Sequence, residues 1–168
     1  MNVPPQVAFL EDAPIAELSR QIKQPTMLLL HITAGRSILT VRSHKTMKRY
    51  TFRFRRPDAK PGWQTRPIWI SVLGGPEEGH IWSFLGTIWP TTQPWKFNLS
   101  AKSTVPSEDQ SVRAIRWIAS HLPNAVDVLM EDADWWHEGR CSRCARRLTV
   151  PESIESGFGS ECRKEVGL

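Results

Sequence analysis

All three cysteines of the chain lie near its C-terminus, in a pattern typical of metal ligands. Cys141 and Cys144 form a C-x2-C pair, and 17 residues separate Cys144 from Cys162. Two thiolates at this spacing can hold one ion from a single tight turn, and a structural zinc site needs four soft or borderline ligands in a tetrahedron. His137, with three residues between it and Cys141, is the best-placed fourth ligand. The sequence therefore predicts a zinc site formed by His137, Cys141, Cys144 and Cys162.

Two alternatives concern this site. His121 or Glu161 could replace His137 as the fourth ligand. A C-x2-C pair can also be a redox motif, but that function needs a thioredoxin-like strand and helix, and residues 146–151 do not fit that context. Four ligands leave no position for a reactive water, so the predicted zinc is structural. Zinc deaminases need Glu two residues after His, whereas Glu138 follows His137 directly.

The segment that leads to Cys162 adds a second pattern. Pro151 can begin a short helix that ends at Gly157, and a second short helix would carry Cys162. A C-x2-C turn followed by a helix-borne cysteine resembles a miniature treble-clef or zinc-ribbon unit. Residues 137–162, with their P-E-S-I and G-x-G-x-x-C portions, resemble a short zinc-binding domain of unknown function found at the C-termini of phage and actinobacterial proteins. The resemblance implies a metal module and a phage origin, and it implies no known reaction.

The region upstream of this segment shares the resemblance more loosely. Residues 33–122 resemble the uncharacterised basic β-rich region that often precedes the zinc-binding domain.

Composition indicates a globular protein outside the membrane. The chain has 168 residues, of which 40% are hydrophobic. It contains no apolar run of about 18 residues, the length that a spanning helix requires. Residues 1–25 lack a basic stretch followed by an apolar block, so we expect no secretory signal. Cysteines in a metal pattern without a signal predict a reducing cytoplasm rather than a disulfide scaffold.

Positive charge is concentrated in one segment. The net charge is +5, yet residues 42–66 contain nine basic residues against the single acid Asp58, or +8. The remaining residues therefore have 22 − 9 = 13 basic and 17 − 1 = 16 acidic groups, or −3. A local basic stretch of this kind suits a polyanionic partner.

Hydrophobic patterning predicts a small antiparallel sheet. Residues 48–56 alternate Tyr50, Phe52 and Phe54 with polar positions, which indicates a strand with an aromatic inner face and an arginine outer face. Residues 43–47 would form the turn of a hairpin with the strand before them. The other predicted strands are residues 26–33, 37–42, 68–73, 80–89 and 125–130, with 95–99 as an edge strand.

Two helices are predicted outside the metal segment. Residues 13–22 have apolar side chains at helical spacing. Ser107 with Gln110 matches a capping box that would begin a helix ending near Leu122. On that helix Trp117 is expected to pack under the zinc module, with an exposed contact to a base or a partner as the alternative. Trp69, Trp82 and Trp89 are expected in the core, while Trp63, Trp95, Trp135 and Trp136 are expected to be less buried.

Together these patterns predict an α+β fold, a small antiparallel β-sheet with one packing helix plus a C-terminal treble-clef or zinc-ribbon-like module. The expected organisation is an N-terminal arm with a short helix (1–25), a basic α+β domain (26–130) and a zinc-binding module (131–168). Residues 131–134 would be an acidic hinge before the metal turn. The edge strand permits a dimer without requiring one.

Basic residues next to aromatic rings favour nucleic-acid binding, with single-stranded DNA or RNA preferred because bases stack on exposed rings. The alternative is a solvated arginine face without a ligand. A second functional hypothesis is a phage-encoded inhibitor that binds a host defence complex, in the manner of an anti-CRISPR protein. Common catalytic motifs are missing, so we do not expect an enzyme. The expected nucleic-acid contacts are Arg42, Lys45, Lys48, Arg49, Arg53, Arg55, Arg140, Arg143, Arg146 and Arg147.

Overall fold

The computed structural model describes residues 20–74 and 81–168. Most of the helix predicted over residues 13–22 lies outside these ranges, and its last two residues form a short strand. Within the described residues no helix is both long enough and apolar enough to span a bilayer.

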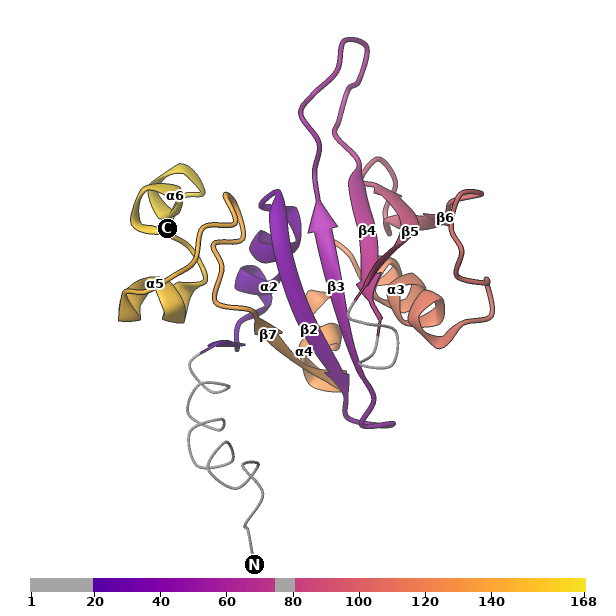
Figure 1. The fold of residues 1–168 in the computed structure, drawn as a ribbon, viewed down its shortest axis with the longest axis horizontal. Helices are drawn as coiled ribbons and strands as arrows, with labels where there is room; N and C mark the ends of the chain where they lie inside the picture. Colours follow the sequence, from indigo (N-terminus) through magenta and orange to yellow (C-terminus); the bar gives the residue numbers. More distant parts are fainter. Residues whose placement is uncertain (1–19, 75–80) are drawn as a thin grey trace, which may run out of the picture.

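The centre of the described part of the molecule is an antiparallel sheet of seven strands. Its spatial order is β1-β7-β2-β3-β4-β5-β6, so the last strand in the chain lies between the first two. Figure 1 shows this sheet face-on. The mixed α+β class predicted from sequence is confirmed. The strands are β1 (Gln21–Ile22), β2 (Arg36–Ser43), β3 (Arg49–Arg55), β4 (Ile68–Leu73), β5 (Trp82–Trp89), β6 (Lys96–Leu99) and β7 (Ala133–His137).

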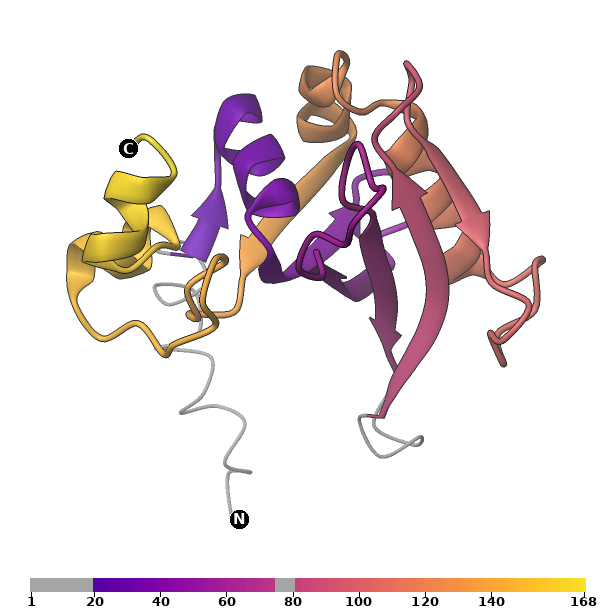
Figure 2. The ribbon, with the colours of Figure 1, turned by 90° about the horizontal axis from the view of Figure 1, so that it is seen from above.

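Within residues 20–74 and 81–168, three helices pack on one face of the sheet. They are α2 (Pro25–Thr33), α3 (Gln110–Ser120) and α4 (Val126–Asp132). Figure 2 shows all three on the same side of the strands. Leu28 of α2, Ile115 of α3 and Leu129 of α4 are fully buried against the inner residues of the sheet, such as Phe52 and Phe54. Two shorter helices, α5 (Pro151–Ser156) and α6 (Ser160–Glu165), lie beside α2 at one end of the molecule.

The strand pattern of β3 is confirmed. Phe52 and Phe54 are fully buried, whereas Arg49 and Arg55 are exposed on the opposite face. Strands β4 and β6 also lie where the sequence predicted them, and β6 is the edge of the sheet.

Two predicted strands are helices. Residues 26–33 form α2, where Pro25 occupies the first turn and Leu28, His31 and Ile32 are buried at helical spacing. Residues 125–130 belong largely to α4, where Val126 and Leu129 are buried. Both segments are short apolar runs, for which periodicity alone does not distinguish a buried strand from a buried helix. The sheet therefore has three covering helices instead of the single one expected.

The cap of α3 also differs from the prediction. Asp109 is the N-cap residue, and its Oδ1 accepts a hydrogen bond from Ser111 N at 2.8 Å. Ser107 instead donates to Glu108. Either side chain can satisfy the first amides of a helix, and here the one nearer to the helix does so.

The predicted acidic hinge is wrong. Ala133 and Asp134 begin β7, which pairs with β1 on one side and β2 on the other. Since β7 ends at His137 and runs into the cysteine turn, the sheet and the metal segment share this strand. It supplies a direct path from the core to the candidate metal ligands.

Several predictions for tryptophan are also wrong. Trp135 is fully buried and Trp136 is 9% exposed, because both lie within β7. Trp69 and Trp82 are only half-buried, since they lie on the face of the sheet opposite the helices. Trp117 packs against the main core and contacts the ring of His121, so it does not lie under the metal module. That position is occupied by Met27, Leu30 and Ala34 of α2 and its C-cap.

Candidate metal centre and arginine face

The three cysteines come together in the folded chain. The sulfur atoms of Cys141, Cys144 and Cys162 all lie within 4.8 Å of one another. Cys141 and Cys162 are buried and Cys144 is half-buried. Three thiolates at this separation form a donor set that fits a soft or borderline divalent cation. The prediction that these three residues could hold a metal ion is confirmed.

A tight turn and a short helix position the sulfur atoms. Cys141 N donates to Arg146 O at 2.8 Å, and Ala145 N donates to Cys141 O at 2.8 Å. Ala145 has φ +66, the left-handed conformation that reverses the chain within the turn. Cys162 comes from α6, which begins after the left-handed Gly157 has ended α5.

The environment affects the thiols differently. Burial would raise the pKa of Cys141, but N–H groups of Gly159, Cys144 and Arg143 donate to its sulfur, and the pKa is lowered overall. Burial raises the pKa of Cys162 to about 11, although Arg143 donates to its sulfur at 3.7 Å. The neighbouring sulfurs contribute to the same rise. Without a cation the cluster therefore disfavours full deprotonation, and a bound divalent ion would reverse this preference.

His137 lies outside the group of three cysteines. Its Nε2 donates to Ile154 O at 2.7 Å, and its Nδ1 accepts from Gly139 N at 3.0 Å. Burial lowers its pKa to about 4, so the ring is neutral with the proton on Nε2. His137 stays a prediction as the fourth ligand, and it would have to exchange one of these hydrogen bonds for the metal.

The other two candidates for the fourth ligand have partners elsewhere. His121 Nδ1 donates to Trp117 O, and Glu161 forms an ion pair with Lys164.

Sequence reasoning missed His31, which joins the metal turn to α2. Its ring stacks on His137 at 5.7 Å and on Phe158 at 4.8 Å between ring centroids. Its Nδ1 lies 2.6 Å from the hydroxyl of Ser142, inside the C-x2-C turn. Burial, and to a smaller extent the neighbouring His137, lower the pKa of His31 to about 3. The segment was predicted as a strand, so nothing in the sequence indicated that this side chain would reach the cysteines.

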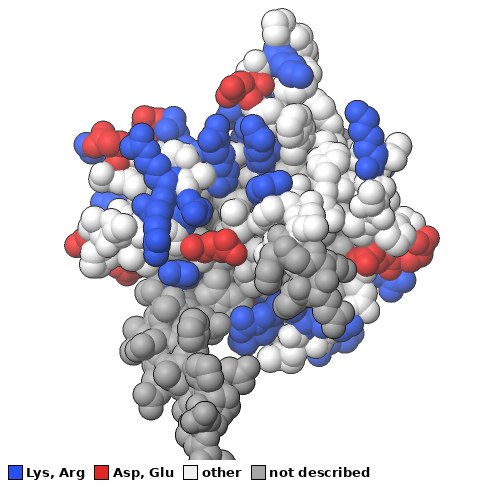
Figure 3. Space-filling view, in the orientation of Figure 1, with Lys and Arg blue, Asp and Glu red and all other residues white. Residues whose placement is uncertain are grey.

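The second candidate site is the face of the sheet opposite the helices. Arg42 pairs with Arg49 across β2 and β3, and Arg53 and Arg55 follow at alternate positions of β3. Alternation places all four on the same face. We call these four residues the arginine face. Figure 3 shows Lys and Arg side chains gathered over this part of the sheet and over the neighbouring loop of the metal module.

Aromatic rings support three of these arginines. The guanidinium carbons of Arg42 and Arg49 lie 5.1 and 5.2 Å from the ring centroid of Trp136. That of Arg53 lies 4.6 Å from the ring centroid of Trp82. These distances are within the range of cation–π attraction. The tryptophans on this face therefore hold guanidinium groups in place.

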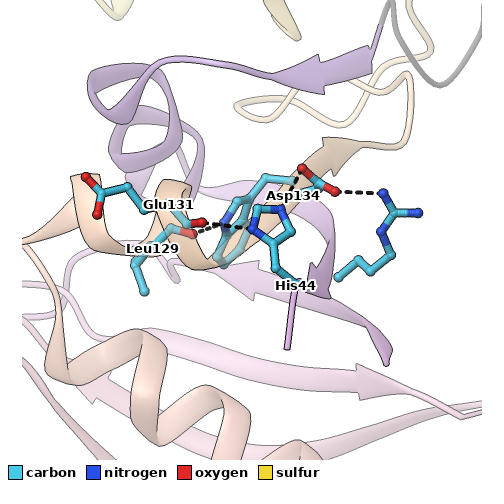
Figure 4. A network of polar contacts seen from close by, with 6 residues as sticks. His44, Leu129, Glu131 and Asp134 are labelled. Carbon is cyan, nitrogen blue, oxygen red and sulfur yellow. Dashed lines mark hydrogen bonds and ion pairs between the residues drawn. The ribbon is translucent and has the colours of Figure 1, made fainter. Parts of the chain in front are cut away.

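A polar network borders the arginine face. Asp134 of β7 accepts from Arg42 Nη2 at 2.7 Å and lies 3.0 Å from His44 Nε2. His44 Nδ1 lies 2.8 Å from Glu131 O (Figure 4). The hydrogen bonds to Asp134 and Glu131 raise the pKa of His44, and the hydrogen bond from His44 lowers that of Asp134.

The remaining basic residues predicted to contact nucleic acid lie elsewhere. Lys45 and Lys48 line a cleft of about 750 Å³ between the hairpin turn and α3, and Lys48 donates to Gln110. Arg140 and Arg143 contact the metal turn itself, through Ala145 O and the sulfur of Cys162. The structure thus separates one predicted surface into the arginine face, a cleft on the helix side, and the exposed arginines of the metal turn, which include Arg146 and Arg147.

Comparisons with known proteins concern the metal segment. A search of curated proteins and a search of solved structures found no match to the chain. Residues 136–167, which contain all three cysteines, match the model of DUF6011, a family of unknown function.

Proposed function

We propose that this protein binds nucleic acid through the arginine face, and that a structural zinc ion holds the cysteine segment against the sheet. The observation that carries the proposal is the set of four arginines on adjacent strands, on the face that α2, α3 and α4 leave uncovered. Three of the four lie over tryptophan rings. Guanidinium groups held in place at a surface suit phosphate oxygens, which they can bind with two parallel hydrogen bonds.

The uncovered face is consistent with a polyanionic partner. A sheet usually buries its apolar face and exposes the other, so an arginine row alone would be an ordinary solvated surface. Here three of the arginines lie next to Trp136 and Trp82, which are partly removed from water. Desolvation together with Arg55 lowers the pKa of Arg53. Cations that lie close together and are partly dehydrated destabilise the folded protein. A bound polyanion would offset this destabilisation.

Zinc is the metal that this donor set favours. Thiolates select soft or borderline ions, and the described cluster contains three of them. The module around it is small, with Cys141, Leu148, Phe158 and Cys162 as its buried residues. A core of this size gains little from apolar burial, so a metal ion would supply much of the free energy that folds it. The zinc would be structural, and we propose no enzymatic activity.

The cellular setting follows from the same residues. The three cysteines are free thiols and form no disulfide bond, which suits the reducing cytoplasm that we propose. A phage origin rests on the resemblance of residues 137–162. An acidic surface of a host protein complex is the other polyanion that the arginine face could meet.

Fluorescence anisotropy with labelled DNA and RNA across a salt series tests the proposal. Changing Arg49→Glu together with Arg53→Glu should abolish binding, because both cations are replaced by anions at the centre of the face. The matched control is Lys102→Glu with Arg113→Glu, two exposed residues outside the arginine face. Each pair replaces two positive by two negative charges and so changes the net charge from +5 to +1.

The control pair should lose only the small part of the affinity that depends on net charge. If both pairs weaken binding equally, the contact is not located on the arginine face. If the unchanged protein binds no nucleic acid near 0.1 M salt, the proposal fails and a protein partner should be sought.

A further inference from the structure

The cleft on the helix side of the sheet has the size of a small-molecule site. Its volume is about 750 Å³, and it lies between the turn that joins β2 to β3 and one face of α3. Gln110, Arg113 and Trp117 follow one another at helical spacing, so all three line the same side of the cleft. Sites for small molecules usually have volumes of about 300–1,000 Å³.

Small side chains leave this space open. Ala114 of α3 and Ala133 of β7 line the cleft, and Ala133 pairs across the sheet with Ser43, which also lines it. A larger side chain at any of these three positions would fill part of the volume. The cleft is therefore formed by the fold itself and needs no rearrangement to open.

Two aromatic residues give the cleft an apolar wall. Tyr50 and Trp117 are both half-buried, and both pack against the main core. The hydroxyl of Tyr50 donates to Gln110 Oε1 at 3.1 Å, and the ring of Trp117 contacts His121, which does not line the cleft. These contacts fix the two rings while part of each stays accessible. A planar group could bury the accessible part, as a nucleobase does on aromatic side chains.

The charged side chains of the lining are mostly basic. Three are basic and one is acidic, namely Lys45, Lys48, Arg113 and Asp132. Their net charge is +2, before any contribution from His44, whose ring is bonded to Asp134. A phosphate monoester has about −1.5 to −2 charges at neutral pH, whereas a carboxylate has one. The charge of the lining therefore matches that of a phosphate monoester.

The basic side chains are available to such a group. Lys45 has no hydrogen bond or ion pair with another residue of the described ranges. Lys48 donates to the neutral amide of Gln110. Arg113 interacts through space with Glu108, but that carboxylate also accepts from Ser107 and does not line the cleft.

We propose that this cleft binds a nucleotide, with the base against Tyr50 and Trp117 and the phosphate near the three basic side chains. The site lies apart from the arginine face, so this inference goes beyond the proposed function and does not depend on it. A free mononucleotide and the phosphorylated end of a strand present the same chemistry, and the experiment distinguishes them.

An NMR titration of the backbone amides of the full chain tests the site. The probes are adenosine 5′-monophosphate, adenosine and inorganic phosphate, near 0.1 M salt. The mononucleotide should shift amides of residues 43–50 and 110–118. It should bind about tenfold more tightly than adenosine or phosphate, because it alone uses both the aromatic wall and the cations.

Two variants change the cleft in different ways. Lys45→Glu should weaken binding of the mononucleotide about tenfold. Its matched control is Lys102→Glu, which makes the same charge change at an exposed residue outside the cleft and should leave binding nearly unchanged. Ala114→Leu should abolish binding by filling the space. Circular dichroism checks that the variants fold, and Lys45→Glu still decides the question if Ala114→Leu does not, because Lys45 is exposed.

The source of the nucleotide is decided with two strands, both labelled at the 3′ end, that carry either a 5′-phosphate or a 5′-hydroxyl. Fluorescence anisotropy compares their affinities. Tighter binding of the phosphorylated strand, lost in Lys45→Glu, would support the proposal and assign the cleft to strand ends. Equal binding of the two strands, with saturable binding of the mononucleotide, would support it and assign the cleft to free nucleotides.

The proposal fails if the mononucleotide causes no saturable shift up to about 10 mM, or if the shifts lie outside the cleft. Equal weakening by Lys45→Glu and Lys102→Glu would also overturn it. The pair Arg49→Glu with Arg53→Glu changes no lining residue and should leave mononucleotide binding intact. Failure of the cleft and failure of the arginine face are therefore separate results.

Discussion

Gly157 occupies a position where a larger residue does not fit. Its φ is +76, and an added Cβ would lie 2.2 Å from Cε1 of His31 and 3.1 Å from Cδ2 of His137. The glycine therefore permits the two histidines and Phe158 to stack between α2 and the metal turn. His31 is held in turn by Ser142, within the C-x2-C pair. The packing of a few side chains thus determines where the cysteines lie.

Gly157→Ala should destabilise the protein by roughly 2–4 kcal/mol, from a left-handed backbone and an overpacked site. Urea unfolding followed by circular dichroism measures the loss. Gly159→Ala is the matched control, because Gly159 has φ −65 and an added Cβ meets no heavy atom within 4 Å. Equal losses of stability in the two variants would show that the close contact with His31 does not restrict the side chain at position 157.

His44 provides a prediction about pH. Its two nitrogens lie near Asp134 and the carbonyl of Glu131, which favour the protonated ring and raise its pKa above the ordinary 6.5. A raised pKa adds stability that is fully present below pH 6.5 and is lost as the pH rises through the folded value. The ring is exposed, so the effect on stability is small.

An NMR titration of the His44 ring should give a pKa above 6.5 in the unchanged protein. In Asp134→Asn the pKa should fall toward that value, because the hydrogen bond to a carboxylate is the largest cause of the shift. An identical titration curve in the variant would show that Asp134 is not the partner in solution.

At the scale of elements, β7 and α2 determine the position of the metal module. Strand β7 pairs on both sides within the sheet and then enters the cysteine turn. Helix α2 contributes Met27 and Leu30 to the small cluster around Cys141 and Phe158. The module is therefore attached to the main core by a strand and by a helix, and its own buried residues are few.

Cys144→Ser should release about one equivalent of zinc, because a structural site loses its metal when one of few strong ligands is removed. Hydrogen exchange should become faster in α5 and α6, while β3 and β4 stay protected. Zinc content is measured by elemental analysis of the purified protein. Ser142→Ala is not a suitable control, since Ser142 contacts His31, and Ser160→Ala at the exposed start of α6 serves instead.

Zinc retained at one equivalent in Cys144→Ser would rule out the proposed ligand set. The same assay on His137→Gln decides the fourth ligand. If this variant loses zinc, His137 is the fourth ligand. If it retains zinc, His137 is not a ligand and only forms hydrogen bonds with Gly139 and Ile154.

At the scale of the whole molecule, the two faces of the sheet have different roles. The helices cover one face and bury the main core, and the other face exposes arginines next to the metal module (Figures 1 and 3). A rigid sheet is a suitable support for the arginines, because neighbouring strands keep their spacing within a few tenths of an ångström. The dependence of nucleic-acid affinity on salt concentration is therefore expected to come from the whole arginine face and not from one residue.

The sequence by itself determined the features that depend on local spacing. The pattern of Cys141, Cys144 and Cys162 predicted a shared site, since two cysteines at C-x2-C spacing can bind one ion from a single turn. The alternation along residues 48–56 predicted β3 and its arginine side, since successive side chains of any strand point to opposite faces. The α+β class followed from the same local patterns.

Only the tertiary structure decided the features that depend on distant neighbours. A short apolar run favours neither form alone, and the run at residues 26–33 is a helix that packs on both the main core and the small cluster around the cysteines. The stacking of His31 on His137 joins residues 106 positions apart. Trp136 lies under Arg42 and Arg49 because β7 returns to pair with β2. Such contacts depend on how strands are ordered in the sheet, and local periodicity carries no information about that order.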